Sequence, residues 1–230
     1  AYERGDLADV VYADDTLLLA VSSSHLSEYL HGVAVAGKKY GMELHWGKFQ
    51  LLPIQCSPSV CTPDAQLIPL KARMEYLGTV LSNDVHDNHE LVKRIAMAKA
   101  DFIALGNVWR RSALTWRRKL AIFHALVESK LLYSMSTICL TVAQERQLNG
   151  FQSRCLRTIL GVAPSFISRV SNAEVLQLSG HIAATALLQK KQLQMLGKVL
   201  SSPEGHPLHT ASFIPATNQP ATERYVRRRG

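Results

Sequence analysis

The spacing of hydrophobic residues changes near residue 88, and this change limits the possible folds of the chain more than any other feature. From there on, hydrophobic side chains recur every three or four residues in three successive stripes. This spacing places each stripe on one face of a helix, so we expect three helices whose hydrophobic faces form the core of a small bundle. A further helix is predicted over residues 183–200. The stripes consist of Leu91, Ile95, Ala98, Phe102 and Leu105; of Leu120, Phe123, Val127 and Leu131; and of Leu148, Phe151, Cys155 and Ile159.

Before residue 88 the pattern is typical of strands and turns. Residues 10–13 and 16–21 are rich in β-forming residues and are separated by Asp14 and Asp15, which predicts a hairpin with a two-residue turn at an exposed tip. The cluster SSSH predicts the start of a helix that ends near Tyr40. The remaining segments predict a strand over 49–54, a loop with one or two short edge strands over 53–69, and a strand or hairpin over 74–82.

These patterns together predict an α+β protein with a β-rich first part and a helical second part. At 230 residues, with 47% hydrophobic and 19% charged residues, the chain is suited to folding and not to disorder. We expect one domain over 1–84, a helical domain over 85–205, and a linker or truncated tail over 206–230. The chain begins with Ala and has a strand pattern within its first ten residues, so we expect it to be a piece of a longer chain.

Charge is distributed unevenly along the chain. The net charge is +8, yet residues 1–90 carry 6 Lys/Arg against 12 Asp/Glu, and residues 91–200 carry 16 against 4. A basic second part attracts polyanions. Its densest group lies around a predicted helix start and suits contacts with phosphates, although a charge run is often only a solvated face. This group consists of Arg110, Arg111, Arg117, Arg118 and Lys119.

The cysteines and the hydrophobic runs exclude several classes of protein. Four scattered cysteines are too few for a disulfide framework and favour a reducing compartment. The spacing of Cys56 and Cys61 with His86 and His89 matches no common zinc motif, so we interpret the two cysteines as ordinary small apolar residues. The sequence shows no run long enough for a membrane span and no secretory leader, and we expect no membrane partner.

Asp14 and Asp15 are the strongest candidates for chemistry. A solvated turn is the simple explanation of an Asp-Asp pair. Two adjacent carboxylates repel each other, however, unless a cation is shared between them. Mg²⁺ suits this role, because it takes one or two carboxylates and completes its coordination with water and substrate phosphates.

The string YADDTLLLA, residues 12–20, resembles the palm-hairpin motif of reverse transcriptases, and most closely that of non-LTR (LINE-like) retrotransposons. GMELHWGK, residues 41–48, is similar to the next palm motif, but His45 replaces its Asn, and Phe49, which follows, replaces its Thr.

Two later segments extend the resemblance. The tripeptide YLG, residues 76–78, resembles the primer grip of these enzymes, and the helical stretch 88–200 looks like their thumb and connection. The resemblance therefore covers nearly the whole chain, with its blocks in the order of the family, and it implies a partial palm over 1–84 and a thumb and connection over 85–205.

The resemblance implies an RNA-directed DNA polymerase that works by two-metal nucleotidyl transfer with Mg²⁺ or Mn²⁺. Its partners would be an RNA template, a DNA primer, deoxynucleotide triphosphates and the upstream remainder of the same polyprotein, inside the cell and in the nucleus. Asp14 would be the principal metal ligand and Asp15 its weaker neighbour. Lys48 would protonate the pyrophosphate leaving group, if it is more than a surface lysine. Tyr76, Leu77 and Gly78 would line the primer.

The chain lacks parts that such a polymerase needs, namely a fingers region and another carboxylate from an earlier palm strand. Asp9 cannot supply that carboxylate, because five extended residues place it roughly 16 Å from Asp14. We therefore expect a fragment that is inactive alone. The alternative is a non-catalytic nucleic-acid-binding remnant of a decayed element, in which the basic helices still act and the aspartates do not.

Overall fold

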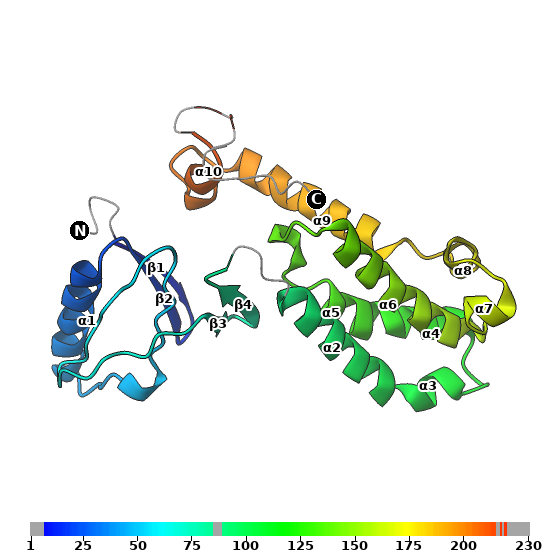
Figure 1. Cartoon of the computed structure of the whole chain (residues 1–230), viewed down its shortest axis with the longest axis horizontal. Coiled ribbons are helices and arrows are strands. Elements are labelled where there is room, and N and C mark those ends of the chain that lie inside the picture. Colours follow the sequence, from blue (N-terminus) through cyan, green and yellow to red (C-terminus); the bar gives the residue numbers. More distant parts are fainter. Residues whose placement is uncertain (1–6, 85–88, 215–216, 218, 220–230) are drawn as a thin grey trace. The chain divides into compact units, whose positions relative to one another are not determined.

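Two antiparallel hairpins and a set of helices give the protein a mixed α+β architecture, which confirms the predicted α+β class (Figure 1). The computed structural model describes residues 7–84, 89–214, 217 and 219. The chain divides into two units, Ala1–His89 and Glu90–Gly230, whereas the predicted boundary lay at residue 84. Each unit is described separately below.

The predicted hairpin at residues 10–21 is present in the first unit. Strand β1 (Leu7–Tyr12) pairs with β2 (Asp15–Ala20), and Tyr12 lies opposite Asp15. The turn is therefore Ala13-Asp14, one residue earlier than predicted. Ala13 has a φ of 53°, a conformation that costs a residue with a Cβ atom about 1–2 kcal/mol. Strand pairing thus overrides the local turn preference, which would put Gly or Asn at this position.

Helix α1 (Ser23–Lys38) covers one face of this hairpin, as Figure 1 shows. Its N-cap is Ser22, whose side chain accepts a hydrogen bond from the backbone N–H of His25 at 3.3 Å, so the polar cluster starts a helix as predicted. The helix and the hairpin share a small hydrophobic core with the loop that follows. This core consists of Leu30, Val60 and Ile68, with Leu18, Leu26, Trp46, Phe49 and Leu51 packed against them.

The predicted strand over 49–54 is wrong. A 3₁₀ turn, η2 (Trp46–Lys48), stands before it, and the segment itself contributes only an isolated bridge from Leu51 to Leu70. The rings of Trp46 and Phe49 lie 4.9 Å apart and pack against the core, which favours a turn over an extended strand here. The loop over 53–69 contains one further bridge, between Cys61 and Leu67.

The segment 74–82 forms a second hairpin, as expected. Strand β3 (Arg73–Tyr76) pairs with β4 (Thr79–Ser82). The two turn residues, Leu77 and Gly78, both have positive φ, at 48° and 75°. A two-residue turn of this kind matches the right-handed twist of the strands.

The second unit consists of helices, and all three predicted hydrophobic stripes lie on its inner faces. Leu120, Phe123, Val127 and Leu131 are buried, as are Leu148, Phe151, Cys155 and Ile159. Leu91 and Ala98 are buried, and the rest of the first stripe packs against them. The elements are α2 (His89–Ala104), α3 (Gly106–Arg110), α4 (Trp116–Ile122), the π-helix η3 (Phe123–Glu128), α5 (Ser129–Leu131), η4 (Met135–Thr137), α6 (Val142–Leu160), α7 (Ser165–Ser168), α8 (Asn172–Ser179), α9 (Ala184–Ser201) and α10 (Pro207–Ser212).

Several elements of this unit differ from the predicted pattern, among them the short helices α3 and α7, which no hydrophobic stripe predicted. The second predicted helix is continuous over residues 116–131, but its middle turn is a π-helix. Helix α8 was not predicted from periodicity. Helix α10 lies inside the predicted tail, where Pro207 at the first position and the side chain of His206 favour a helix start.

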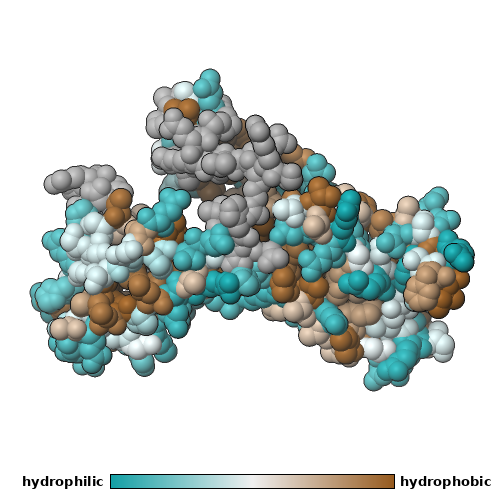
Figure 2. All heavy atoms as spheres, viewed as in Figure 1, coloured by the Kyte–Doolittle hydropathy of each residue, from teal (hydrophilic) through white to brown (hydrophobic). Residues whose placement is uncertain are grey.

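The surface of both units carries hydrophobic residues (Figure 2). On α7, Phe166 and Ile167 are exposed, and on β1, Val11 and Tyr12 are exposed. Cys56, Cys61 and Cys139 are free and exposed, and Cys155 is free and buried. Within the described residues, no helix is both long enough and hydrophobic enough to cross a bilayer.

Candidate functional site

The two predicted metal ligands lie at the exposed tip of the first hairpin. Asp14 is in the turn, Asp15 begins β2, and both side chains are exposed. Strand side chains alternate between faces, so Asp15 lies on the face opposite to Leu18, which packs in the small core beside α1. Val10 and Tyr12 share this open face with Asp15 and are 45% and 65% exposed. Leu17 and Leu19 lie on this face as well, so the hairpin presents a carboxylate among hydrophobic side chains on its uncovered face.

The second hairpin contacts the first directly. The hydroxyl of Tyr76 donates a hydrogen bond to the backbone carbonyl of Val10 at 2.9 Å. This bond joins two segments that lie 66 residues apart in the sequence. The structure thus brings the predicted primer-contacting segment, Tyr76, Leu77 and Gly78, beside the strand that leads to the aspartates.

Lys48, the predicted general acid, belongs to neither hairpin. It is the last residue of η2 and is exposed. Among the described residues, no hydrogen bond or ion pair connects Lys48 with Asp14 or Asp15. Its predicted role as a general acid stays a prediction.

Four of the five predicted phosphate-binding residues are exposed: Arg110, Arg111, Arg117 and Arg118. They lie on either side of the turn between α3 and α4. The guanidinium of Arg117 lies 5.4 Å from the ring centre of Trp116, which is 43% exposed. An exposed aromatic ring among arginines is a combination that nucleic-acid-binding surfaces use for stacking and phosphate contact.

Lys119, the fifth residue, is placed differently. Its side chain is buried, and Nζ donates a hydrogen bond to the backbone carbonyl of Trp109 at 2.6 Å. That carbonyl lies in the last turn of α3, where backbone carbonyls have no partner within the helix. Lys119 thus caps α3 from the following helix, and we leave it out of the proposed phosphate-contacting set.

Other cations of the second unit also have internal partners. Arg94 pairs with Glu90 in a buried ion pair, and Lys130 pairs with Asp101. Arg157 donates to the carbonyls of Ala163 and Val170, at 3.0 Å and 2.7 Å. The basic character of this unit at its surface is therefore smaller than the count of its Lys and Arg residues suggests.

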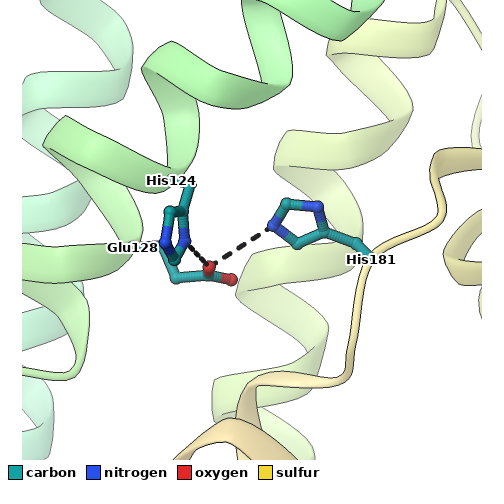
Figure 3. Close-up of side chains that lie close together, drawn as sticks. All are labelled: His124, Glu128 and His181. Carbon is teal, nitrogen blue, oxygen red and sulfur yellow. Dashed lines mark hydrogen bonds and ion pairs between the residues drawn. The ribbon is translucent and has the colours of Figure 1, made fainter.

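A polar cluster that was not predicted from the sequence extends from the core of the second unit to its surface (Figure 3). Oε2 of Glu128 lies 2.7 Å from Nδ1 of His124 and 3.3 Å from Nε2 of His181. Glu128 is 1% exposed. Burial raises the pKa of this carboxyl group, but the hydrogen bonds of His181 and His124, the charge of His181 and the hydrogen bond of Gln152 together hold the pKa below its ordinary value.

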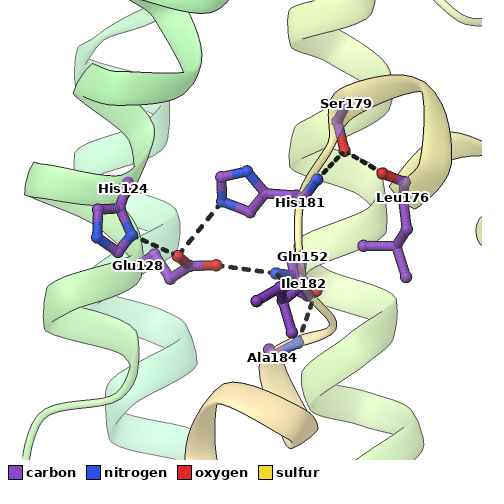
Figure 4. A network of polar contacts seen from close by, with 8 residues as sticks. All are labelled: His124, Glu128, Gln152, Leu176, Ser179, His181, Ile182 and Ala184. Carbon is purple, nitrogen blue, oxygen red and sulfur yellow. Dashed lines mark hydrogen bonds and ion pairs between the residues drawn. The ribbon is translucent and has the colours of Figure 1, made fainter.

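Gln152 on α6 anchors this cluster from the other side (Figure 4). Its Nε2 donates to Oε1 of Glu128 and to the carbonyl of Ile182, each at 2.8 Å. Its Oε1 accepts a hydrogen bond from the backbone N–H of Ala184 at 2.8 Å. The network links the helix over 116–131, α6 and the segment between α8 and α9.

One half of this cluster has a signal in the sequence. His124 and Glu128 are four residues apart on a predicted helix, a spacing that places them on one face. His181 lies 53 residues after Glu128, outside the predicted helices, so no local pattern indicates their contact.

Comparison with known proteins adds no relative: no protein-family model, no curated protein and no solved structure matches the chain.

Proposed function

We propose that this chain is the palm-hairpin and thumb portion of an RNA-directed DNA polymerase, of the kind encoded by non-LTR retrotransposons. The observation that supports it most is the hydrogen bond between the two hairpins. The segment that resembles the primer grip is hydrogen-bonded, through Tyr76, to the strand that carries the aspartate motif. In a polymerase these two segments must lie together, because the primer terminus has to meet the metal ions.

The position of the aspartates suits this role. A hairpin tip holds Asp14 and Asp15 on rigid strands while leaving both carboxylates accessible. Two Mg²⁺ or Mn²⁺ ions would supply the activation of the primer 3′-hydroxyl and the stabilisation of the departing pyrophosphate. Among the described residues, the tip carries this pair of carboxylates alone, so the proposal requires the remaining ligand and the nucleotide-binding surface from a further segment.

The second unit supports the proposal through its exposed arginines. Arg110, Arg111, Arg117 and Arg118 contact the phosphates of the template–primer duplex, with Trp116 beside them. Such contacts hold a duplex without reading its sequence.

The test is a primer-extension assay on two proteins. The chain alone should not extend an RNA-templated DNA primer, because its metal site is incomplete. The chain produced together with the upstream protein segment that the proposal requires should extend the primer. If the isolated chain extends the primer, the proposal that part of the metal site lies outside this chain is wrong. Duplex binding without extension by the joined protein supports instead a non-catalytic nucleic-acid-binding remnant.

A further inference from the structure

We propose that His124, Glu128 and His181 bind one Zn²⁺ ion in the core of the second unit. Nδ1 of His124, a carboxylate oxygen of Glu128 and Nε2 of His181 all lie within 4.8 Å of one another (Figure 3). All three residues belong to the second unit, so the zinc site does not depend on the proposed polymerase function.

The donor set limits the choice of metal, because two histidines and one carboxylate are typical of Zn²⁺ and Fe²⁺ sites. Two imidazole nitrogens and one carboxylate oxygen suit Zn²⁺, whereas Mg²⁺ prefers oxygen ligands throughout. Zinc sites with three protein ligands keep a fourth tetrahedral position for water. The side chain of His124 is 68% exposed, so the cluster is accessible to solvent from that side. The site is therefore suited to a zinc ion with one water ligand.

The distances to Glu128 lie near those of such an ion, whereas the two imidazole nitrogens lie within 4.8 Å of each other and must approach by up to about 1.4 Å. Two ligands at ~2.1 Å from a tetrahedral zinc ion lie about 3.4 Å apart. Nε2 of His181 lies 3.3 Å from Oε2 of Glu128, which already matches. Nδ1 of His124 is hydrogen-bonded to the same oxygen at 2.7 Å, so its ring must withdraw by about 0.7 Å. The high exposure of His124 leaves room for this movement.

A second layer of contacts prepares the carboxylate for this role. Gln152 donates to Oε1 of Glu128, and this bond turns Oε2 towards both imidazoles (Figure 4). Gln152 is itself fully buried and fixed by Ile182 and Ala184. Partners of this kind orient metal ligands and tune their affinity.

The backbone around the cluster is also unusual. His124 and Glu128 both lie in the π-helix η3, and π-helical turns within longer helices are frequent at functional sites. A zinc ion at this turn would tie the helix over 116–131 to the segment between α8 and α9, which carries His181. Zinc binding should therefore raise the thermal stability of this unit.

The test is an isothermal calorimetric titration of the full chain with ZnCl₂ at pH 7. Exposed thiols also bind zinc, so the titrated protein carries the substitutions Cys56→Ser, Cys61→Ser and Cys139→Ser. We expect one equivalent of zinc to bind. His124→Ala and His181→Ala should each weaken binding at least tenfold, and His31→Ala, at an exposed position on α1, should leave it unchanged.

Two further readouts keep the result decisive. Circular dichroism shows whether each variant is folded, and the exposed position of His124 makes His124→Ala the safer variant. Co²⁺ in place of zinc should give the intense visible absorption bands of a four-coordinate site, and His124→Ala should remove them. The proposal is overturned if no stoichiometric binding occurs in the protein with the three cysteine substitutions, or if both histidine variants bind zinc as tightly as this parent.

Discussion

Lys119 and its neighbours Arg117 and Arg118 are adjacent in the sequence, yet their positions predict opposite effects of substitution. The ammonium group of Lys119 is buried and donates to the carbonyl of Trp109, whereas both arginine side chains are exposed. We expect Lys119→Ala to lower the free energy of unfolding and to leave duplex binding unchanged. The double variant Arg117→Ala/Arg118→Ala should weaken duplex binding and leave stability unchanged.

The magnitudes follow from the contacts of each residue. Lys119→Ala removes a hydrogen bond from a charged donor, worth about 1.5–3 kcal/mol, and three largely buried methylene groups at about 0.8 kcal/mol each. Release of a desolvated charge offsets part of this sum, so the net loss of stability is about 2–4 kcal/mol. Each arginine–phosphate contact contributes about 0.9 to the slope of log K against log salt, so the double variant should lower the slope by about 1.8.

Two assays on the same preparations measure these effects. Urea unfolding followed by circular dichroism reports stability, and fluorescence anisotropy of a labelled duplex at several salt concentrations reports the slope. Lys38→Ala, at an exposed position on α1, controls for the loss of any one cation. If Lys119→Ala lowers the slope while its unfolding midpoint stays unchanged, the assignment of Lys119 as an internal cap is wrong.

Three further predictions concern single residues. Ala13→Gly should raise stability by up to about 1 kcal/mol in urea unfolding, because Gly adopts positive φ without strain; a loss of stability contradicts the turn. Burial raises the pKa of Cys155 to about 12, against a smaller lowering by Arg154, so iodoacetamide at pH 8 should label the exposed cysteines and spare Cys155, as peptide mass spectrometry would show. The folded-state pKa of Glu128 is below its ordinary 4.5, so its contribution to stability is present above that pH and lost as the pH falls through the folded pKa. Unfolding at pH 3–7 should show this loss, and Glu128→Gln should abolish it.

The long helices of the second unit could be predicted, because one periodic stripe is enough to define a buried face. The three stripes do lie in the core. Helix α8 lacks a long stripe, but its sequence holds a capping box between Ser171 and Glu174 and a C-terminal Gly180 with φ 63°. Those local signals are sufficient to predict it.

Features that depend on contacts between distant segments could not be predicted. The burial of Lys119 follows from the way α4 packs beside the end of α3, and a run of basic residues gives no sign of it. The contact of Glu128 with His181 likewise exists only once α6 positions the segment between α8 and α9. In the first hairpin, the pattern predicted both strands and the exposed tip, but the turn position depended on pairing between strands.

The most direct test of the proposed function is the effect of Asp14→Asn on primer extension by the chain joined to the upstream segment that the proposal requires. Loss of the principal metal ligand should remove several kcal/mol of transition-state stabilisation, a fall in rate of about a thousandfold or more. Duplex binding should stay within about twofold, because the exposed arginines lie elsewhere. Asp64→Asn, at an exposed loop position, should leave both quantities unchanged. Full extension activity after Asp14→Asn would contradict the assignment of the hairpin as the metal site.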